Sequence, residues 1–297
     1  MLTLHAGGAT LLLAPEIGGG VVQWRHRGRP MFRPTAPATL AQAAADGNSR
    51  QLACYPLVPF SGRVANRRFS WQGVSYDLPE RFGGFAIHGV GWLRPWTVTA
   101  QTATSARLEL EVAPSVDWPF AFRSWQNFTL AADSLAMEIG IENRHDAAAP
   151  CGFGLHPFFP RSPELTLQFT AGSVWHNAGP GEVPSERTAI PPEWDHHEGR
   201  KVGPVFIDND FPGWDGRALL RYPDRGYQIR VTADKVFGHT VVYVPDGRDF
   251  FAIEPVSHMN DALNRMDQEP DNGILVLSPG ESRSGRALYA VEECSLE

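Results

Sequence analysis

The stretch LAMEIGIE, residues 135–142, is the clearest indication of the fold in this chain. Its apolar side chains Leu135, Met137, Ile139 and Ile141 occupy every second position, and small or acidic residues stand between them. A period of two is the period of a β-strand, whose successive side chains point to opposite faces. The stretch therefore predicts a strand with one buried face and one face toward solvent.

The same alternation occurs on both sides of this stretch. RLELEV at residues 107–112 and YQIRV at residues 227–231 repeat it. HTVVYV at 239–244 and GILVL at 273–277 are short apolar runs, typical of more deeply buried strands. Turn residues separate the runs, and the 29 glycines and 25 prolines are spread along the whole chain. We therefore expect an all-β fold, a large antiparallel β-sandwich, with residues 1–297 forming a single domain.

Helical periodicity is confined to two short segments. Residues 39–45 and residues 258–264 are each predicted to form a short helix. The longest stretch without any periodicity, residues 177–203, is rich in Pro, Glu and His. We expect it to form a loop over the surface or over the rim of a site.

Composition excludes several classes of function. The 26 basic and 33 acidic residues give a net charge of −7, and the basic residues form no stripe along which nucleic acid could bind. No apolar run reaches the length of about 18 residues typical of a membrane-spanning helix, so we expect no membrane partner. Cys54, Cys151 and Cys294 are widely spaced, and the N-terminus has no secretory pattern, so we expect a cytoplasmic protein. The sequence leaves the oligomeric state open.

One glutamate stands where an apolar strand would continue. In FFAIEPVSHMNDALN, residues 250–264, Glu254 shares a strand face with Phe250 and Ala252. Partial desolvation there would raise its pKa and make it a better base near neutral pH. A solvent-exposed glutamate at a strand end, or one paired with an arginine, fits this segment equally well.

A histidine among aromatic residues is the second candidate for chemistry. His156 lies in CGFGLHPFFP, residues 151–160, where the glycines allow the backbone to approach a ligand closely. Phe158 and Phe159 offer flat surfaces for a sugar ring, and a histidine can donate a proton near pH 7. Taken alone, the segment is equally typical of a hydrogen-bonded core histidine.

Hydrogen-bond donors are concentrated in the segment at residues 62–92. It carries Arg63, Asn66, Arg67 and His88, whose planar donor groups suit the recognition of hydroxyls. The alternative for the Asn-Arg pair is a turn at a strand edge.

Acceptors are concentrated in FIDNDFPGWDG, residues 206–216. Asp208 and Asp210 stand near Phe211 and Trp214, a combination that suits carbohydrate because hydroxyls need acceptors and the C–H face of a sugar needs an apolar platform. Asx turns would produce the same pattern. No histidine motif typical of a metal site accompanies these residues, so we expect no metal.

Together and in this order, the segments resemble the aldose 1-epimerase (galactose mutarotase) family. The resemblance covers most of the chain, from about residue 58 to residue 282. Its motifs are GRVANRRFSWQGVSYDL (62–78), AIHGVGW (86–92), the run from Asn143 to HPFF at 156–159, IDNDFPGWDG (207–216), IEPVSHMNDALN (253–264) and LSPGES (277–282). The resemblance implies a β-supersandwich that interconverts the α and β anomers of free sugars without cofactor or metal.

The resemblance also implies roles for individual residues. Glu254 corresponds to the general base that takes the proton of the C1 hydroxyl, and His156 to the acid that protonates the ring oxygen. The ring then opens, the aldehyde rotates about C1–C2, and closure yields the other anomer. The positions that would hold the substrate are His88, Arg67, Asn66 and Asp208, with Asp210 as the alternative acid.

The motifs depart from the family pattern in ways that leave the substrate open. The chain has NRR, HGV, HPFFP and EPV where the family often has NRI, HGG, H-x-Y-F-N-L and E-T-Q. These changes surround the sugar rather than replace the proton carriers.

Three other functions remain as alternatives. An enzyme for a hexose 6-phosphate would need cations that converge on the phosphate, and the candidates are Arg63, Arg67, Arg68, Arg81 and Arg94. A non-catalytic sugar-binding protein would have no need of both Glu254 and His156. A glycosidase with two carboxylates, Glu254 and Asp208, would leave His156 without a role.

Overall fold

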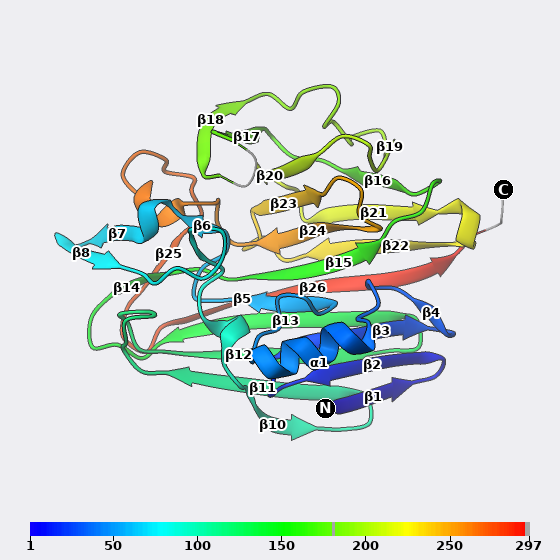
Figure 1. The fold of residues 1–297 in the computed structure, drawn as a ribbon, viewed down its shortest axis with the longest axis horizontal. Coiled ribbons are helices and arrows are strands. Elements are labelled where there is room, and N and C mark those ends of the chain that lie inside the picture. The colour runs from blue at the N-terminus through cyan, green and yellow to red at the C-terminus, as the bar shows by residue number, and fades with distance from the viewer. Residues whose placement is uncertain (180–181, 295–297) are drawn as a thin grey trace.

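Two large antiparallel sheets form the body of the computed structural model, which describes residues 1–179 and 182–294 (Figure 1). The first sheet has eleven strands and the second has nine. In spatial order the first contains β1 (Leu2–Ala6), β2 (Ala9–Ala14), β3 (Gly20–His26), β5 (Cys54–Leu57), β15 (Gly154–Pro160), β24 (Phe250–Val256), β23 (His239–Val244), β20 (Ile207–Pro212), β17 (Val174–Asn177) and β18 (Pro184–Thr188), with β4 (Arg29–Pro30) beside β3.

The second sheet carries the stretch that predicted the fold. In spatial order its strands are β10 (Thr97–Gln101), β11 (Ser105–Val112), β12 (Phe122–Leu130), β13 (Ser134–Asn143), β26 (Ser282–Glu293), β22 (Tyr227–Ala233), β21 (Arg217–Tyr222), β16 (Thr166–Phe169) and β19 (Arg200–Lys201). The expected antiparallel β-sandwich is confirmed.

Short elements complete the structure. The two-stranded pairs are β14 (Ala149–Cys151) with β25 (Leu275–Leu277), β6 (Arg63–Val64) with β9 (Ala86–Ile87), and β7 (Arg68–Trp71) with β8 (Val74–Asp77). One α-helix, α1 (Pro37–Asp46), accompanies the 3₁₀ turns η1 (Ala65–Arg67), η2 (Gly91–Leu93), η3 (Pro223–Arg225) and η4 (Ala262–Asn264) in the described part of the chain. The described residues contain no helix with the length and hydropathy that a membrane crossing needs.

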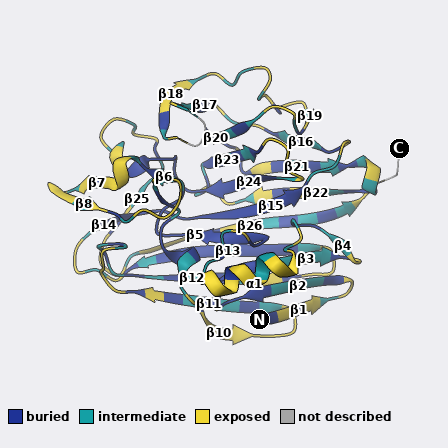
Figure 2. Ribbon diagram, in the orientation of Figure 1, coloured by how far each residue is buried: buried dark blue, intermediate teal, exposed yellow. Residues whose placement is uncertain are grey.

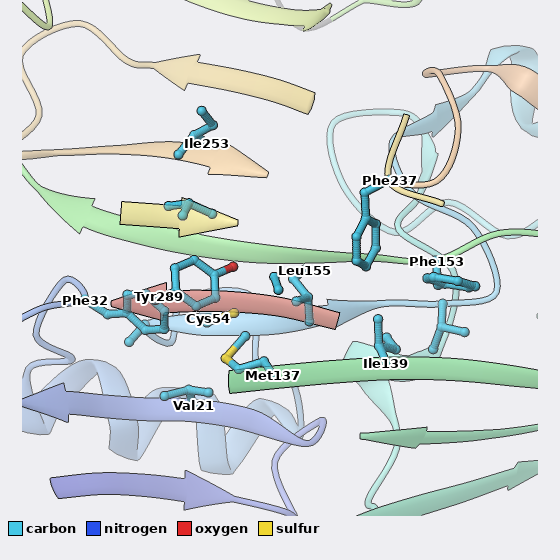
Figure 3. Packing of buried hydrophobic residues seen from close by; sticks show 14 of the residues in the cluster. Val21, Phe32, Cys54, Met137, Ile139, Phe153, Leu155, Phe237, Ile253 and Tyr289 are labelled. Atoms are coloured by element: carbon cyan, nitrogen blue, oxygen red, sulfur yellow. The ribbon is translucent and has the colours of Figure 1, made fainter. Parts of the chain in front are cut away.

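The main core lies between the two sheets. Leu155 and Ile253 contribute to it from the first sheet, and Met137, Ile139 and Tyr289 from the second (Figure 3). Because successive residues of a strand point to opposite faces, the neighbours of Leu155 and Ile253 in sequence point away from this core. The strands β15 and β24 are nonetheless buried along nearly their whole length (Figure 2), so their outer face is covered too.

The outer face of the first sheet has two covers. At the β2–β3 end it is covered by α1, whose Ala43 packs with Ala14, Val22 and Leu52 (Figure 1). Farther along, over β5, β15, β24, β23 and β20, the connecting segments leave a pocket. The site is therefore built on the side of the sheet opposite the main core.

Several local predictions were wrong or incomplete. The helix expected at residues 258–264 is reduced to the turn η4, because Asp261 has a left-handed φ of 59° and the side chains of His258 and Asp261 accept hydrogen bonds from the backbone of residues 61 and 65. The run GILVL forms only the short strand β25, in which Val276 is 48% exposed. The expected loop at 177–203 contains β18 and β19 among its described residues. The first predicted helix is confirmed as α1.

The core between the sheets should carry much of the stability. Ile139 of β13 is 0% exposed, so Ile139→Ala is expected to lower the free energy of unfolding by about 2–5 kcal/mol through lost burial and a cavity. Val116 is 80% exposed, and Val116→Ala should change the free energy of unfolding little. Urea titration of both variants checks this, and equal losses would contradict it.

Candidate active site

The floor of the pocket is a row of side chains across neighbouring strands of the first sheet. Tyr55 of β5 pairs with His156 of β15, and the register between β15 and β24 sets His156 opposite Glu254. Glu254 pairs with Val241 of β23, which pairs in turn with Asp210 of β20. The period of two turns all of these side chains to the outer face, away from the core. Strand register therefore brings together residues from distant parts of the sequence.

The acid and the imidazole proposed for catalysis are in direct contact. His156 Nε2 lies 3.1 Å from Glu254 Oε1, and both side chains are buried. Burial raises the pKa of Glu254 well above 4.5, and the nearby Asp208 carboxylate raises it further. Burial also lowers the pKa of His156 to about 3, with Arg33 adding to the effect. Both shifts favour the uncharged forms, so the pair holds one proton between its two facing atoms and has no net charge.

The pocket above this pair encloses about 150 Å³. Its lining combines hydrogen-bonding groups with flat apolar surfaces, which is the combination that a sugar ring requires. The polar lining residues besides the pair are Arg50, Arg63, His88, Asp208, Asn209, Asp210 and Asn260, and the aromatic ones are Tyr55, Phe82, Phe158 and Tyr243.

His88 is a neutral hydrogen-bond donor at the pocket wall. Its Nδ1 accepts the Gly62 N–H at 3.1 Å, so the proton of the neutral ring lies on Nε2. Burial holds the pKa of His88 well below 6.5, and His156 lowers it further, so the ring is uncharged near neutral pH. The ring stands edge-on to His156, with centroids 5.6 Å apart. This leaves the Nε2–H of His88 available to a ligand in the pocket that it lines.

Asp208 is paired with a cation. Arg63 Nη2 lies 3.2 Å from Asp208 Oδ2, and both side chains are largely buried. Burial raises the pKa of Asp208, and the guanidinium of Arg63 opposes that rise. The ion pair holds the Asp208 carboxylate and the Arg63 guanidinium in a fixed orientation in the pocket wall.

Asp210 also lines the pocket and has a different partner. Its Oδ2 lies 3.1 Å from His239 Nδ1, and the other ring nitrogen of His239 lies 3.2 Å from the Asp271 carbonyl. Burial alone would lower the pKa of His239, but the Asp210 carboxylate and the hydrogen bond to the Asp271 carbonyl together raise that pKa above its ordinary value. Asp210 Oδ1 is buried and has no hydrogen-bond partner among the described residues. The sequence left open which of Asp208 and Asp210 would face the substrate, and both line the pocket.

Asn66 and Arg67 lie outside the pocket. Both are exposed in η1 with left-handed φ values of 51° and 56°, and Arg67 Nη1 lies 3.9 Å from Glu80 Oε2. The pocket cation of this segment is Arg63, four residues before Arg67 in the chain. The sequence placed Arg63 among the donors of this segment, but not among the positions expected to hold the substrate.

The arginines considered for a phosphate do not converge. Of the five, only Arg63 lines the pocket, and Asp208 already neutralises it. The others form ion pairs elsewhere: Arg67 with Glu80, Arg68 with Asp77, and both Arg81 and Arg94 with Asp117. A cation that sequence analysis did not single out, Arg50, does line the pocket, with its guanidinium 3.9 Å from the centre of the Phe82 ring.

Other lining residues were also missed from the sequence. The ring of Tyr55 stacks on His156, with centroids 4.5 Å apart and planes inclined by 23°. Tyr243 and Asn260 line the pocket from β23 and from the segment after β24. Nothing in the local sequence of these residues distinguishes them, because their role follows from the pairing of β5, β15, β24 and β23.

Comparison with known proteins gives a consistent result. The sequence model of the aldose 1-epimerase family matches residues 1–290. The uncharacterized protein YphB of Escherichia coli (strain K12) is 31% identical over 302 residues, covering 98% of both chains. The crystal structure of an Escherichia coli K12 protein, provisionally named an aldose 1-epimerase, has a TM-score of 0.87 at 29% identity and 98% coverage of both chains. A galactose 1-epimerase from Lactobacillus acidophilus NCFM has a TM-score of 0.77 at 16% identity, over 98% of this chain and 94% of that one, which shows a common fold.

These matches extend over nearly the whole chain. They confirm the resemblance found in the sequence motifs and the galactose mutarotase-like architecture of the two sheets. Family and fold together support a sugar epimerase, which is an isomerase. The protein belongs to the aldose 1-epimerase family.

Proposed function

We propose that the protein interconverts the α and β anomers of a free hexose by acid–base ring opening and closure, with Glu254 as base and His156 as acid. The observation that carries the proposal is the buried contact of 3.1 Å between His156 Nε2 and Glu254 Oε1 in a polar pocket. The reaction needs one group that takes a proton and one that gives it, each typically worth about a hundred- to ten-thousand-fold in rate. No nucleophile is required.

The proton count of the pair balances in this scheme. In the reactive form Glu254 is a carboxylate and His156 an imidazolium, a form reached by proton transfer along their hydrogen bond. Glu254 takes the proton of the C1 hydroxyl, the bond from C1 to the ring oxygen breaks, and His156 protonates that oxygen. The pair is then carboxylic acid and imidazole, the uncharged forms that burial favours. Rotation about C1–C2 and the reverse transfers give the other anomer.

The remaining polar groups of the pocket would hold the hydroxyls. His88 Nε2–H is a neutral donor, and Asp208 is an acceptor whose orientation is fixed by Arg63. Phe158 and Tyr243 offer apolar surfaces for the C–H face of the ring. Asn66 and Arg67 were expected to hold the substrate, and because both lie outside the pocket we propose Arg63 in their place.

The test is anomer exchange measured by polarimetry or NMR on freshly dissolved α-glucose and α-galactose. We expect the wild type to raise the rate above the spontaneous one in proportion to enzyme concentration. An unchanged rate for every free hexose would contradict the proposal, and sugar binding without acceleration would identify a binding protein instead.

A phosphorylated hexose is the second candidate because Arg50 lines the pocket and forms no ion pair with any described residue. A single free arginine is a weak phosphate site, since phosphate recognition generally uses several charge-assisted hydrogen bonds. We therefore expect glucose 6-phosphate to bind no more tightly than glucose. Much tighter binding of the phosphate, lost in Arg50→Gln, would reverse the order of the two candidates.

A further inference from the structure

The segment after Glu254 binds the backbone of the segment that carries Arg63. The Arg63 N–H donates to Asn260 Oδ1, and the Asp261 N–H donates to the Arg63 carbonyl at 3.0 Å. Both the N–H and the carbonyl of Arg63 are thus hydrogen-bonded to this segment. The same segment binds two neighbouring amides: Ser61 N–H donates to His258 Nε2 (3.0 Å) and Ala65 N–H donates to Asp261 Oδ1 (2.9 Å). The Gly62 N–H between them donates to His88 Nδ1 (3.1 Å).

This contact fixes the orientation of the Asn260 side chain. A backbone N–H only donates, so the atom that faces Arg63 must be the amide oxygen, and the NH₂ group must point the other way. Asn260 is 8% exposed and lines the pocket, and its Nδ2 has no hydrogen-bond partner among residues 1–179 and 182–294. Asn260 Nδ2 does not belong to the fully buried polar atoms that lack a partner in the described part of the chain, so it is open to the pocket and can donate to a ligand there.

Packing leaves this amide little freedom. A Cβ added at Gly62 would clash with the Oδ1 and Cγ atoms of Asn260, so the amide occupies the space that a side chain at residue 62 would need. Gly62 also has a left-handed φ of 65°, which favours glycine. The absent side chain at 62 therefore makes room for Asn260 beside Arg63.

The charges around the amide define what it can bind. The neighbouring carboxylates of Asp208 and Asp210 are acceptors, and they suit the hydrogen of a sugar hydroxyl. The oxygen of the same hydroxyl still needs a donor, and a neutral amide supplies one without adding charge. We propose that Asn260 is a substrate-binding residue whose Nδ2–H donates to a hydroxyl oxygen of the sugar, held in position by the Arg63 amide.

This inference rests on the proposed function, because it takes the ligand of the pocket to be a hexose. Binding can still be measured separately from catalysis. In a sugar solution that has already reached anomeric equilibrium, calorimetric titration gives a dissociation constant that does not depend on turnover. Sugar binding without acceleration would therefore overturn the proposed function and leave this inference standing.

Two variants separate the proposed donation by Asn260 Nδ2 from the structural contact that Asn260 Oδ1 makes with Arg63. Asn260→Asp keeps an oxygen that accepts the Arg63 N–H but replaces the donor, whereas Asn260→Ala removes both. We expect Asn260→Ala to raise the dissociation constant for the preferred hexose about fivefold to tenfold, the usual effect of one lost hydrogen bond. Gln101→Glu makes the same amide-to-acid change at an exposed residue of β10, in the other sheet, and should leave the dissociation constant unchanged.

Monodeoxy hexoses identify the hydroxyl that Asn260 contacts. In the wild type, removing that one hydroxyl should weaken binding about fivefold or more, while Asn260→Ala should bind the parent sugar and that deoxy sugar with similar dissociation constants. Two outcomes would overturn the inference. In one, the removal of each hydroxyl raises the dissociation constant by the same factor in Asn260→Ala as in the wild type, which indicates that Asn260 is a purely structural residue. In the other, the wild type binds no hexose at all.

Discussion

Replacing Glu254 with glutamine is expected to lower the enzyme-catalysed rate of anomer exchange by about a hundred- to ten-thousand-fold. Glutamine has nearly the same shape and can still contact His156, but its amide cannot accept the proton of the C1 hydroxyl. Because the pocket keeps its donors and its volume, the concentration of sugar at half-maximal rate should change much less than the turnover number. Polarimetry or two-dimensional exchange NMR on the preferred hexose measures both quantities.

The matched control is Glu111→Gln, the same change on an exposed residue of β11 in the second sheet. It should leave the rate unchanged. Full activity in Glu254→Gln would remove that residue from the role of base while leaving the family assignment intact.

Stability provides an independent check on the same variant. The pKa of Glu254 is raised in the folded protein, chiefly by burial, so the folded state binds the proton more tightly than the unfolded state does. Folding stability from this group is therefore present below the unfolded pKa and is lost as pH rises toward the folded pKa. A neutral glutamine has no such loss. We expect Glu254→Gln to unfold at the same or a higher temperature than the wild type at neutral pH.

Replacing His156 with alanine is the second change with a large expected effect, a loss of about a hundred- to ten-thousand-fold in turnover number. The more specific readout is the dependence of that rate on pH. In the wild type the pair must keep one shared proton, so activity should fall as pH drops through about 3 and also as pH rises through the raised pKa of Glu254. These pH values belong to the pair rather than to either residue alone.

In His156→Ala only the carboxylate remains, and it acts as a base only when it has lost its proton. The residual rate should therefore rise with pH through the raised pKa of Glu254, over the range in which the wild-type rate falls. A variant with an unchanged pH profile would show that His156 does not carry the transferred proton. His197→Ala, an exposed histidine outside the pocket, is the control.

The fold could be predicted because alternation is a local property. The stretch LAMEIGIE lies within β13, and its Met137 and Ile139 pack in the core as their spacing indicates. The run HTVVYV also forms a strand, β23, but Val241 and Tyr243 line the pocket, because the first sheet is covered on both faces. An apolar run does not distinguish a core face from a face under a ligand.

The site could be predicted only in part, because backbone turns and distant contacts decide it. Arg63 and Arg67 are both arginines in one short motif, and the two successive left-handed residues that turn Arg67 outward leave no clear trace in the sequence. It was easier to predict that Asp208 and Asp210 would lie together, since a spacing of two puts both on one strand face. The helix expected from residue 258 failed because Asp261 has a left-handed φ, and because the side chains of Asn260 and Asp261 bind backbone amides of the Arg63 segment.

The reacting pair and the mouth of the pocket belong to different kinds of structure. His156 and Glu254 lie on interior strands of the first sheet, where any displacement would break ladder hydrogen bonds on two sides. Arg50 and Phe82 come from connecting segments, and Phe82 is 48% exposed. Mutations at the mouth are therefore tolerated where mutations on the strands are not. Divergence among descendants of this gene should accordingly alter which sugars are accepted long before it alters how their rings are opened.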